Sequence, residues 1–406
     1  MTTLSDDIND YCFFDTETRS FPGTEGSDGD VTECGTYRYM KNAAPIMVQY
    51  AIGNAPVRIV CRDRWTSDRR LGDAYVHPTD LPEDFLDFRN RAERGEAWFV
   101  AWNAAFDREA MKAVGGDAYF KTDMVIDAMA QAVVSNLPPS LDGAAKTLKL
   151  SGKVPDGKHL IRMFCPAGGA WPNDNPEDWD TFKRYGLVDV DLLREAFMST
   201  RHLSRAEWEE YWANEDINQR GMPIDLPFVE AAAQLADVSR EYINEQLAEL
   251  SGGAVGKVTQ VARLASYVDE NTTLPLIRDI LVKETEEDED GGVTVTKLGL
   301  DRGRIERVLA YLDKEDEERG LTDVDWAIYQ MLDLRLYGGS AAPGKFSKML
   351  TQHTGGRVRG QYVFNGANQT GRFSSRGVQV HNLTRSTLGE EREQNFINTV
   401  TEAAGK

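Results

Sequence analysis

The sequence predicts an α/β domain with a mixed sheet, followed by a mainly α-helical domain. Short apolar runs typical of strands dominate the beginning of the chain, whereas apolar residues at helical spacing dominate from residue 205 onward. A chain of 406 residues is too long for one compact core, so two or three domains are expected. We place the boundary near residues 203–210, which gives domains of residues 1–205 and 206–406.

The elements follow from pattern and turn residues. Strands are expected at 11–18, 47–52, 57–61 and 97–102, with the second and third joined in a hairpin by Gly53-Asn54-Ala55-Pro56. A helix is expected from 83 to 92, after a capping signature, and another after 103. Further helices are expected at 123–134, 140–150, 177–197, 205–218, 226–250, 257–268, 274–282, 302–312 and 324–336.

Composition restricts the kind of protein. With 41% hydrophobic residues but no apolar run of membrane-spanning length, the chain is expected to be soluble and cytoplasmic. The five histidines are scattered, and no two of the four cysteines are close in sequence. This pattern argues against a disulfide framework and against a thiolate or histidine zinc site. Any metal is therefore expected to be held by oxygen ligands.

Positive charge is concentrated in one segment of an acidic chain. The net charge is −20, yet residues 334–389 contain eight Lys or Arg and no Asp or Glu, so the remainder of the chain carries −28. A solvated basic surface would explain the charge alone, but the exclusion of acids favours a binding place for a polyanion. The DNA-binding candidates are Lys345, Lys348, Arg357, Arg359, Arg372, Arg376 and Arg385.

The first strand ends in two carboxylates, Asp15 and Glu17, separated by one residue. The period of two in a strand places both on one face, with Thr16 turned away. Two adjacent acids repel unless a cation lies between them, and Mg²⁺ prefers such oxygen ligands. The plainer alternative is a strand that simply runs out into solvent.

Two later segments carry similar side chains. Asn103 and Asp107 follow an apolar strand, and Tyr185 and Asp189 are four residues apart on a long helix, so the latter two share a helical face. Taken singly, each has an ordinary structural interpretation, such as a core tyrosine beside an exposed acid.

The ordered set Asp15-x-Glu17, Asn103-x-x-x-Asp107 and Tyr185-x-x-x-Asp189 resembles the tyrosine branch of the DEDD exonuclease superfamily, which has a ribonuclease-H-like fold. The resemblance implies a 3′–5′ exonuclease that uses two divalent ions, Mg²⁺ or Mn²⁺, to hydrolyse phosphodiesters. Asp15 would bridge both ions, Glu17 and Asp189 would complete the water-activating site, and Asp107 would hold the second ion.

The same resemblance assigns the remaining site residues. Tyr185 would orient the attacking water rather than act as a base, because a free tyrosine titrates near pH 10. Thr16, Asn103 and Phe106 would contact the substrate, with Asn103 positioning the terminal nucleotide.

A second resemblance covers the basic segment. Residues 366–375 (GANQTGRFSS) and 379–385 (QVHNLTR) are similar to the part of family A DNA polymerases that contacts the primer–template backbone. Residues 216–225 and 344–350 resemble the thumb region of phage-type members. The resemblance implies a proofreading exonuclease of a phage-like replicative polymerase, with an incomplete thumb and palm in residues 206–406 and DNA as its partner.

One departure limits this interpretation. In family A polymerases the polymerising carboxylates lie downstream of that segment, where this chain has four Glu and no Asp after residue 386. We therefore expect no polymerisation by this chain alone, which would be either a truncation or one half of a split polymerase with palm and fingers on a separate chain. A non-catalytic DNA-binding assembly subunit and an RNA-trimming exonuclease are the alternatives. The acidic run 284–292 is expected to be a solvated loop.

Overall fold

The structure, a computed structural model, describes residues 3–63, 65, 74–150, 157–287, 293–340, 342–367, 370–383 and 389–403, with the backbone alone at 283–287 and 293–296. The chain divides into two compact units, Met1–Asp225 with Lys348–Thr384, and Leu226–Ser347 with Arg385–Lys406. The functional boundary at 205/206 stays a prediction. By packing, helix α9 (Arg205–Arg220) belongs to the first unit, because its aromatic side chains are buried in that core.

A mixed sheet forms the centre of the first unit. Within the described residues it has five strands in the order β3-β2-β1-β4-β5. Strand β1 (Tyr11–Ser20) is antiparallel to β2 (Ala43–Ile52) and parallel to β4 (Trp98–Ala101). The mixed α/β architecture and the hairpin of β2 with β3 (Arg58–Cys61) are therefore confirmed. The finer ribonuclease-H-like assignment stays a prediction.

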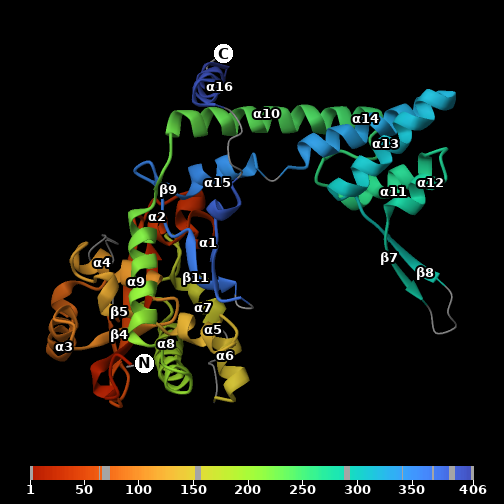
Figure 1. The fold of residues 1–406 in the computed structure, drawn as a ribbon. Coiled ribbons are helices and arrows are strands. Elements are labelled where there is room, and N and C mark those ends of the chain that lie inside the picture. Colours follow the sequence, from red (N-terminus) through yellow and green to blue (C-terminus); the bar gives the residue numbers. More distant parts are fainter. Residues whose placement is uncertain are drawn as a thin grey trace. The chain divides into compact units, whose positions relative to one another are not determined.

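Alternation along β1 assigns its two faces. Cys12 and Phe14 join one apolar cluster, whereas Tyr11 and Phe13 join another. The first cluster is completed by helix α3 (Glu83–Glu93), and the second by α9 and helix α8 (Pro176–Met198). Because both faces are covered, β1 is buried along nearly its whole length. Figure 1 shows α9 as a yellow-green helix running alongside β4 and β5.

One predicted helix is wrong at its start. The segment expected to be helical from 123 to 134 contains a short turn, η4 (Thr122–Met124), then strand β5 (Val125–Asp127), and only then helix α5 (Ala128–Val134). Strand β5 is fully buried and pairs in parallel with β4. Burial and pairing with a neighbouring strand thus override the helical spacing, which a single sequence cannot reveal.

The other elements of this part of the unit are short helices. Two single-turn helices that were not predicted from the sequence lie between β1 and β2. Helix α4 is the one expected after 103, and it begins directly behind β4. The elements are η1 (Ile8–Asp10), η2 (Gly26–Gly29), α1 (Val31–Cys34), α2 (Thr36–Tyr39), η3 (Pro78–Asp80), α4 (Ala105–Gly115), α6 (Leu141–Leu148) and α7 (Gly157–Phe164).

Residues 348–384 belong to the first unit and consist of short elements. Helix α15 (Gly344–Gln352) is followed by β9 (His353–Thr354) and β10 (Arg357–Val358), which form a sheet with β6 (Met222–Pro223). A hairpin of β11 (Tyr362–Ala367) and β12 (Arg372–Ser375) and the turn η5 (Val380–Asn382) complete it. Such short strands carry almost no periodic signal, so the sequence analysis predicted none of them.

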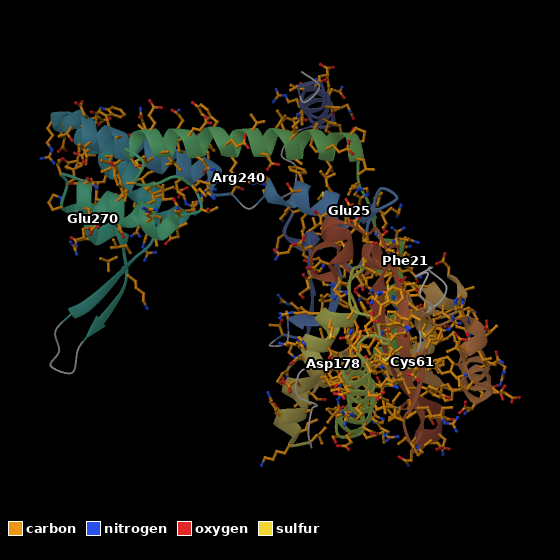
Figure 2. All side chains as sticks on the ribbon, turned by 180° about the vertical axis from the view of Figure 1, so that it is seen from behind. Phe21, Glu25, Cys61, Asp178, Arg240 and Glu270 are labelled. Atoms are coloured by element: carbon orange, nitrogen blue, oxygen red, sulfur yellow. The ribbon has the colours of Figure 1, made fainter. Side chains whose placement is uncertain are left out.

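The second unit is mainly helical, as predicted. Leu and Ile side chains from several helices form its core, and no helix in the described part of the chain is both long and apolar enough to cross a bilayer. Figure 2 shows Arg240 on α10 and Glu270 on α11, two exposed charges of this unit. Its helices are α10 (Leu226–Leu250), α11 (Val261–Asn271), α12 (Leu276–Leu281), α13 (Arg302–Arg319), α14 (Asp323–Gly338) and α16 (Glu390–Ala403).

The expected acidic loop is partly a strand. Strand β7 (Val282–Glu287) contains the first acids of the run and pairs antiparallel with β8 (Val293–Leu298), so the loop prediction is wrong for residues 284–287. Alternating Thr and Val in β8 supply a strand pattern that the charge of β7 conceals. The rest of the run, 288–292, lies outside the described residues. Figure 1 shows this hairpin projecting from the helices of its unit.

Candidate active site

Four acidic side chains predicted from the sequence meet at the end of β1. Tyr11 and Phe13 face α8, so the alternation of the strand turns Asp15 and Glu17 toward the same helix. Removal from water raises the pKa of Asp15 well above its usual range, and the charges of Asp107, Glu17 and Asp189 raise it further.

Asp107 is held by Thr16. It lies in the first turn of α4, is 2% exposed, and its Oδ1 accepts hydrogen bonds from the Thr16 backbone N–H at 3.0 Å and from the Thr16 hydroxyl at 2.7 Å. Burial raises the pKa of Asp107 to about 7, although the two hydrogen bonds from Thr16 pull it down. Thr16, expected to contact the substrate, thus positions a carboxylate in this structure.

Tyr185 and Asp189 reach the same place from α8. Both are buried, and the hydroxyl of Tyr185 shares a hydrogen bond with Asp189. Burial, then the charges of Glu17, Asp189 and Asp15, raise the pKa of Tyr185 above its ordinary value of 10.0. The ring is tightly packed, because a Cβ at Gly157 would lie 2.3 Å from its Cε2. The hydroxyl is therefore fixed beside three carboxylates and stays protonated at neutral pH.

Asn103 and Phe106 lie next to this group. Asn103 has a left-handed backbone (φ 62°), and its N–H donates to Asp127 Oδ1 at 3.0 Å. It lines a cavity of about 260 Å³ together with Asp127 and Tyr211. Phe106 stacks on Tyr39 with ring centroids 6.1 Å apart. Contact of either residue with a nucleotide stays a prediction.

The four carboxylates are chemically suited to a hard divalent cation, but they are not arranged around a formed metal site. All four are carboxylates, the ligand type that Mg²⁺ and Mn²⁺ prefer, and their mutual repulsion would be relieved by a cation. Yet no group of three or more His, Cys, Asp or Glu side chains among the described residues is arranged to hold a metal ion. The four acids nevertheless share one site, since the charges of Asp107, Glu17 and Asp189 all act on Asp15.

The predicted DNA-binding cations are largely occupied with the protein itself. Arg357 donates to the carbonyls of Arg220 and Gly221 at 2.7 and 2.9 Å, and Arg359 donates to the carbonyl of Gln219 at 2.9 Å. Arg376 and Lys348 also donate to carbonyls, so these side chains help to hold residues 348–383 in the first unit.

Their charges are nevertheless not neutralised by carboxylates. In the described part of the chain, no ion pair joins Lys348, Arg357, Arg359, Arg372 or Arg376 to an acid. Lys348, Arg359 and Arg376 line a cavity of about 430 Å³ that also reaches Asn103. Arg385 lies outside the described residues, and DNA binding by the whole set, Lys345 included, stays a prediction.

A buried network that the sequence analysis missed links the acidic site to this basic segment. Arg108, next to Asp107, donates to Glu215 on α9 at 3.1 Å. Glu215 accepts from Asn218 at 2.9 Å, and Asn218 exchanges two 2.8 Å hydrogen bonds with the backbone of Tyr362. The only hint of this network in the sequence is an acid, Glu215, among the aromatic residues of its helix. Its partner Arg108 lies 107 residues away, so the pair could not be inferred from the sequence.

No family model matches the chain. Most of this chain is similar in sequence to a DNA polymerase. That relative, the DNA polymerase of Bacillus phage SP02, is 27% identical over 380 residues, which cover 89% of this chain and 50% of the relative. The chain thus spans about half the length of the curated relative it matches.

One solved structure is also matched. The polymerase domain of Pol1 from M. smegmatis, in complex with DNA primer–template and dNTP, matches with a TM-score of 0.46 and 14% identity, covering 85% of this chain and 50% of that one. The kinship with phage DNA polymerases that the sequence predicted is supported by the sequence relative. The exonuclease branch stays a prediction.

Proposed function

We propose that this chain is a divalent-metal-dependent 3′–5′ exonuclease that trims DNA ends, the proofreading portion of a phage-like family A DNA polymerase. The observation that carries the proposal is the electrostatic convergence of Asp107, Glu17 and Asp189 on Asp15, from three separate elements. Buried like charges are costly, and such clusters are typical of functional sites. Kinship with a phage DNA polymerase supports DNA as the substrate.

The chemistry divides between the bound ions and the side chains. Two divalent ions, Mg²⁺ or Mn²⁺, would supply an activated water and stabilise the negative charge that develops on the phosphate. Asp15, Glu17, Asp107 and Asp189 would hold them. Tyr185 remains protonated because its pKa is raised, so its hydroxyl orients water by hydrogen bonding and does not accept a proton.

The basic segment supplies the contact with DNA in this proposal. Positive side chains without carboxylate partners line a cavity that also contains Asn103, beside the acidic site. A strand bound along these cations would present its 3′ end to the carboxylates. The palm and fingers of the polymerase would come from the part of the relative that this chain does not match, on the same or a separate chain.

A nuclease assay with matched variants tests the proposal. A 5′-labelled single strand with Mg²⁺ should give a ladder of shortened products that disappears with EDTA and in the double variant Asp15→Ala/Glu17→Ala. The control is Glu391→Ala/Glu393→Ala on α16, which removes the same charge at the same spacing from an exposed surface. Degradation that persists in the first variant, or is lost in the control, contradicts the assignment.

Two other functions predict different results. An RNA-trimming exonuclease would degrade RNA ends faster than DNA ends in the same assay. A non-catalytic DNA-binding subunit would give no ladder but would bind DNA with a steep salt dependence. This second candidate is favoured by the positive side chains Lys348, Arg359 and Arg376, which line one cavity and have no carboxylate partner among the described residues.

A further inference from the structure

Gln49 is a buried amide whose polar atoms are unpaired within the described part of the chain. It lies on β2, is 0% exposed, and neither its Nε2 nor its Oε1 has a hydrogen-bond partner among the described residues. Met47 and Ala51, two positions away on either side, both belong to apolar clusters. An apolar side chain at position 49 would therefore fit its neighbours, and the unpaired amide destabilises the fold.

The amide lies between the strand and the helix that carry the acidic site. Gln49 is the direct cross-strand partner of Asp15, and antiparallel partners project from the same face of a sheet. From the other side, a Cβ at Gly186 of α8 would lie 2.1 Å from Gln49 Nε2. Gly186 directly follows Tyr185 and precedes Asp189 by three residues. Only glycine leaves room for the amide at this point.

We propose that Gln49 is a positioning residue of the carboxylate site. Its amide is a spare donor and acceptor pair held next to Asp15 and to the turn of α8 that presents Tyr185. With a divalent cation held by the carboxylates, this amide would hydrogen-bond the carboxylate of Asp15 and fix its orientation. The inference rests on the proposed function, because it assigns a role within the same site.

A costly buried polar group with a functional role has a distinctive signature. Replacing it by an apolar group of similar shape should stabilise the protein and weaken the site. A merely structural glutamine would give the opposite result in stability and no change in the site. The two roles therefore predict opposite directions for the melting temperature.

The test compares Gln49→Met with Gln131→Met. Methionine matches glutamine in length without hydrogen bonding. Gln131 is equally buried, but its Nε2 donates to the carbonyl of Phe197 at 2.9 Å and to the Thr200 hydroxyl at 2.7 Å. Gln49→Met should raise the melting temperature by a few degrees and lower Mn²⁺ affinity and kcat by about 10- to 100-fold, with KM for the strand unchanged. Gln131→Met should lower the melting temperature and leave Mn²⁺ affinity and kcat unchanged.

A second variant keeps the test sharp if Gln49→Met folds poorly. Gly186→Ala leaves the amide in the protein but pushes its nitrogen aside, which flexible side-chain ends allow. It should lower Mn²⁺ affinity and kcat in the same direction. A wild-type protein with neither nuclease activity nor Mn²⁺ affinity overturns the proposed function together with this inference. An active wild type whose Gln49→Met and Gly186→Ala variants bind Mn²⁺ and turn over normally overturns the inference alone.

Discussion

Arg108 and Glu215 form an ion pair of 3.1 Å in which both side chains are almost completely buried. The pair joins α4, which carries Asp107, to α9, whose Asn218 holds the backbone of Tyr362. The pair therefore fixes the position of Asp107 on α4 relative to residues 348–384, which carry the cations without carboxylate partners. The acidic site and residues 348–384 of the basic segment are parts of one packed unit, which a division of the chain at residue 205 conceals.

Glu215→Gln should therefore destabilise the first unit strongly. The change leaves Arg108 as a buried cation, a loss that typically amounts to about 3–5 kcal/mol. We expect a loss at the lower end of this range, because Glu109 lies 3.4 Å from Arg108 and offsets part of its charge. Urea unfolding at pH 7 measures the loss.

The control for this measurement is Glu209→Gln on the same helix. Glu209 pairs with Arg205 at 3.0 Å on the exposed side of α9, where such pairs contribute about 0–1 kcal/mol. Equal losses in the two variants would show that the buried pair does not stabilise the unit.

The hydroxyl of Thr16 should tune the protonation of Asp107. In the native protein, the 2.7 Å hydrogen bond from the Thr16 hydroxyl lowers the pKa of Asp107. Thr16→Val removes this bond but keeps the shape of the side chain and the backbone N–H donor. The pKa of Asp107, about 7 in the native protein, should rise further, so the carboxylate ionises only at higher pH. If the chain is the proposed nuclease, the acidic limb of its pH–rate profile moves to higher pH.

Thr18→Val is the matched control on the same strand. It removes a buried 3.0 Å hydrogen bond between Thr18 and the hydroxyl of Tyr39 and leaves both hydrogen bonds from Thr16 to Asp107 in place. Its acidic limb should coincide with that of the native protein. A shift of equal size in both variants would assign the effect to loss of packing on β1.

The site was predictable where chemistry follows local periodicity. The alternation of β1 placed Asp15 beside Glu17, and the helical spacing placed Tyr185 beside Asp189. The meeting of these pairs with Asp107 came from the resemblance, because periodicity cannot join elements that are far apart in sequence. Gln49 was not predictable, since its role depends on a strand register and on a glycine in another element.

The fold was less predictable where strands are short. Strand β5 has three residues and is recognised only by its pairing with β4. Arg357 and Arg359 look like free cations in the sequence, yet their donors bind backbone carbonyls of α9 and its neighbour. Charge counts predict the electrostatics of a segment but not which atoms satisfy each guanidinium.

Tyr185→Phe should separate turnover from metal binding. The change removes the hydroxyl that bonds Asp189 but leaves the ring packed against Phe182, with which it stacks at 6.1 Å. In the proposed nuclease, kcat should fall by about 10- to 100-fold, because water loses an orienting partner, while Mn²⁺ affinity changes little. Tyr75→Phe, which removes a 3.3 Å bond to the carbonyl of Ser20, should leave both quantities unchanged. Unaltered turnover in Tyr185→Phe would contradict the role of this hydroxyl.

Asp127 should make the stability of the first unit depend on pH. Burial is the main cause that raises the pKa of Asp127 from 3.8 to about 6, and the charge of Glu215 adds to it. A carboxyl with a raised native pKa contributes stability that is present below pH 4 and is lost as the pH rises through 6. The shift corresponds to about 3 kcal/mol at most, so native protein should lose stability between pH 4 and 7 on this account.

Asp127→Asn should remove this loss. The amide oxygen can still accept the N–H groups of Asn103 and Met129, which are 3.0 and 2.9 Å from Asp127 Oδ1. The variant should therefore be more stable than native protein at pH 7–8, with the advantage vanishing toward pH 4, in urea unfolding across that range. Asp301→Asn tests the sign, because hydrogen bonds from Arg304 lower the pKa of Asp301 and its loss should destabilise the protein at neutral pH. An Asp127→Asn variant that is less stable than native protein at every pH would show that Asp127 stabilises the fold in its charged form.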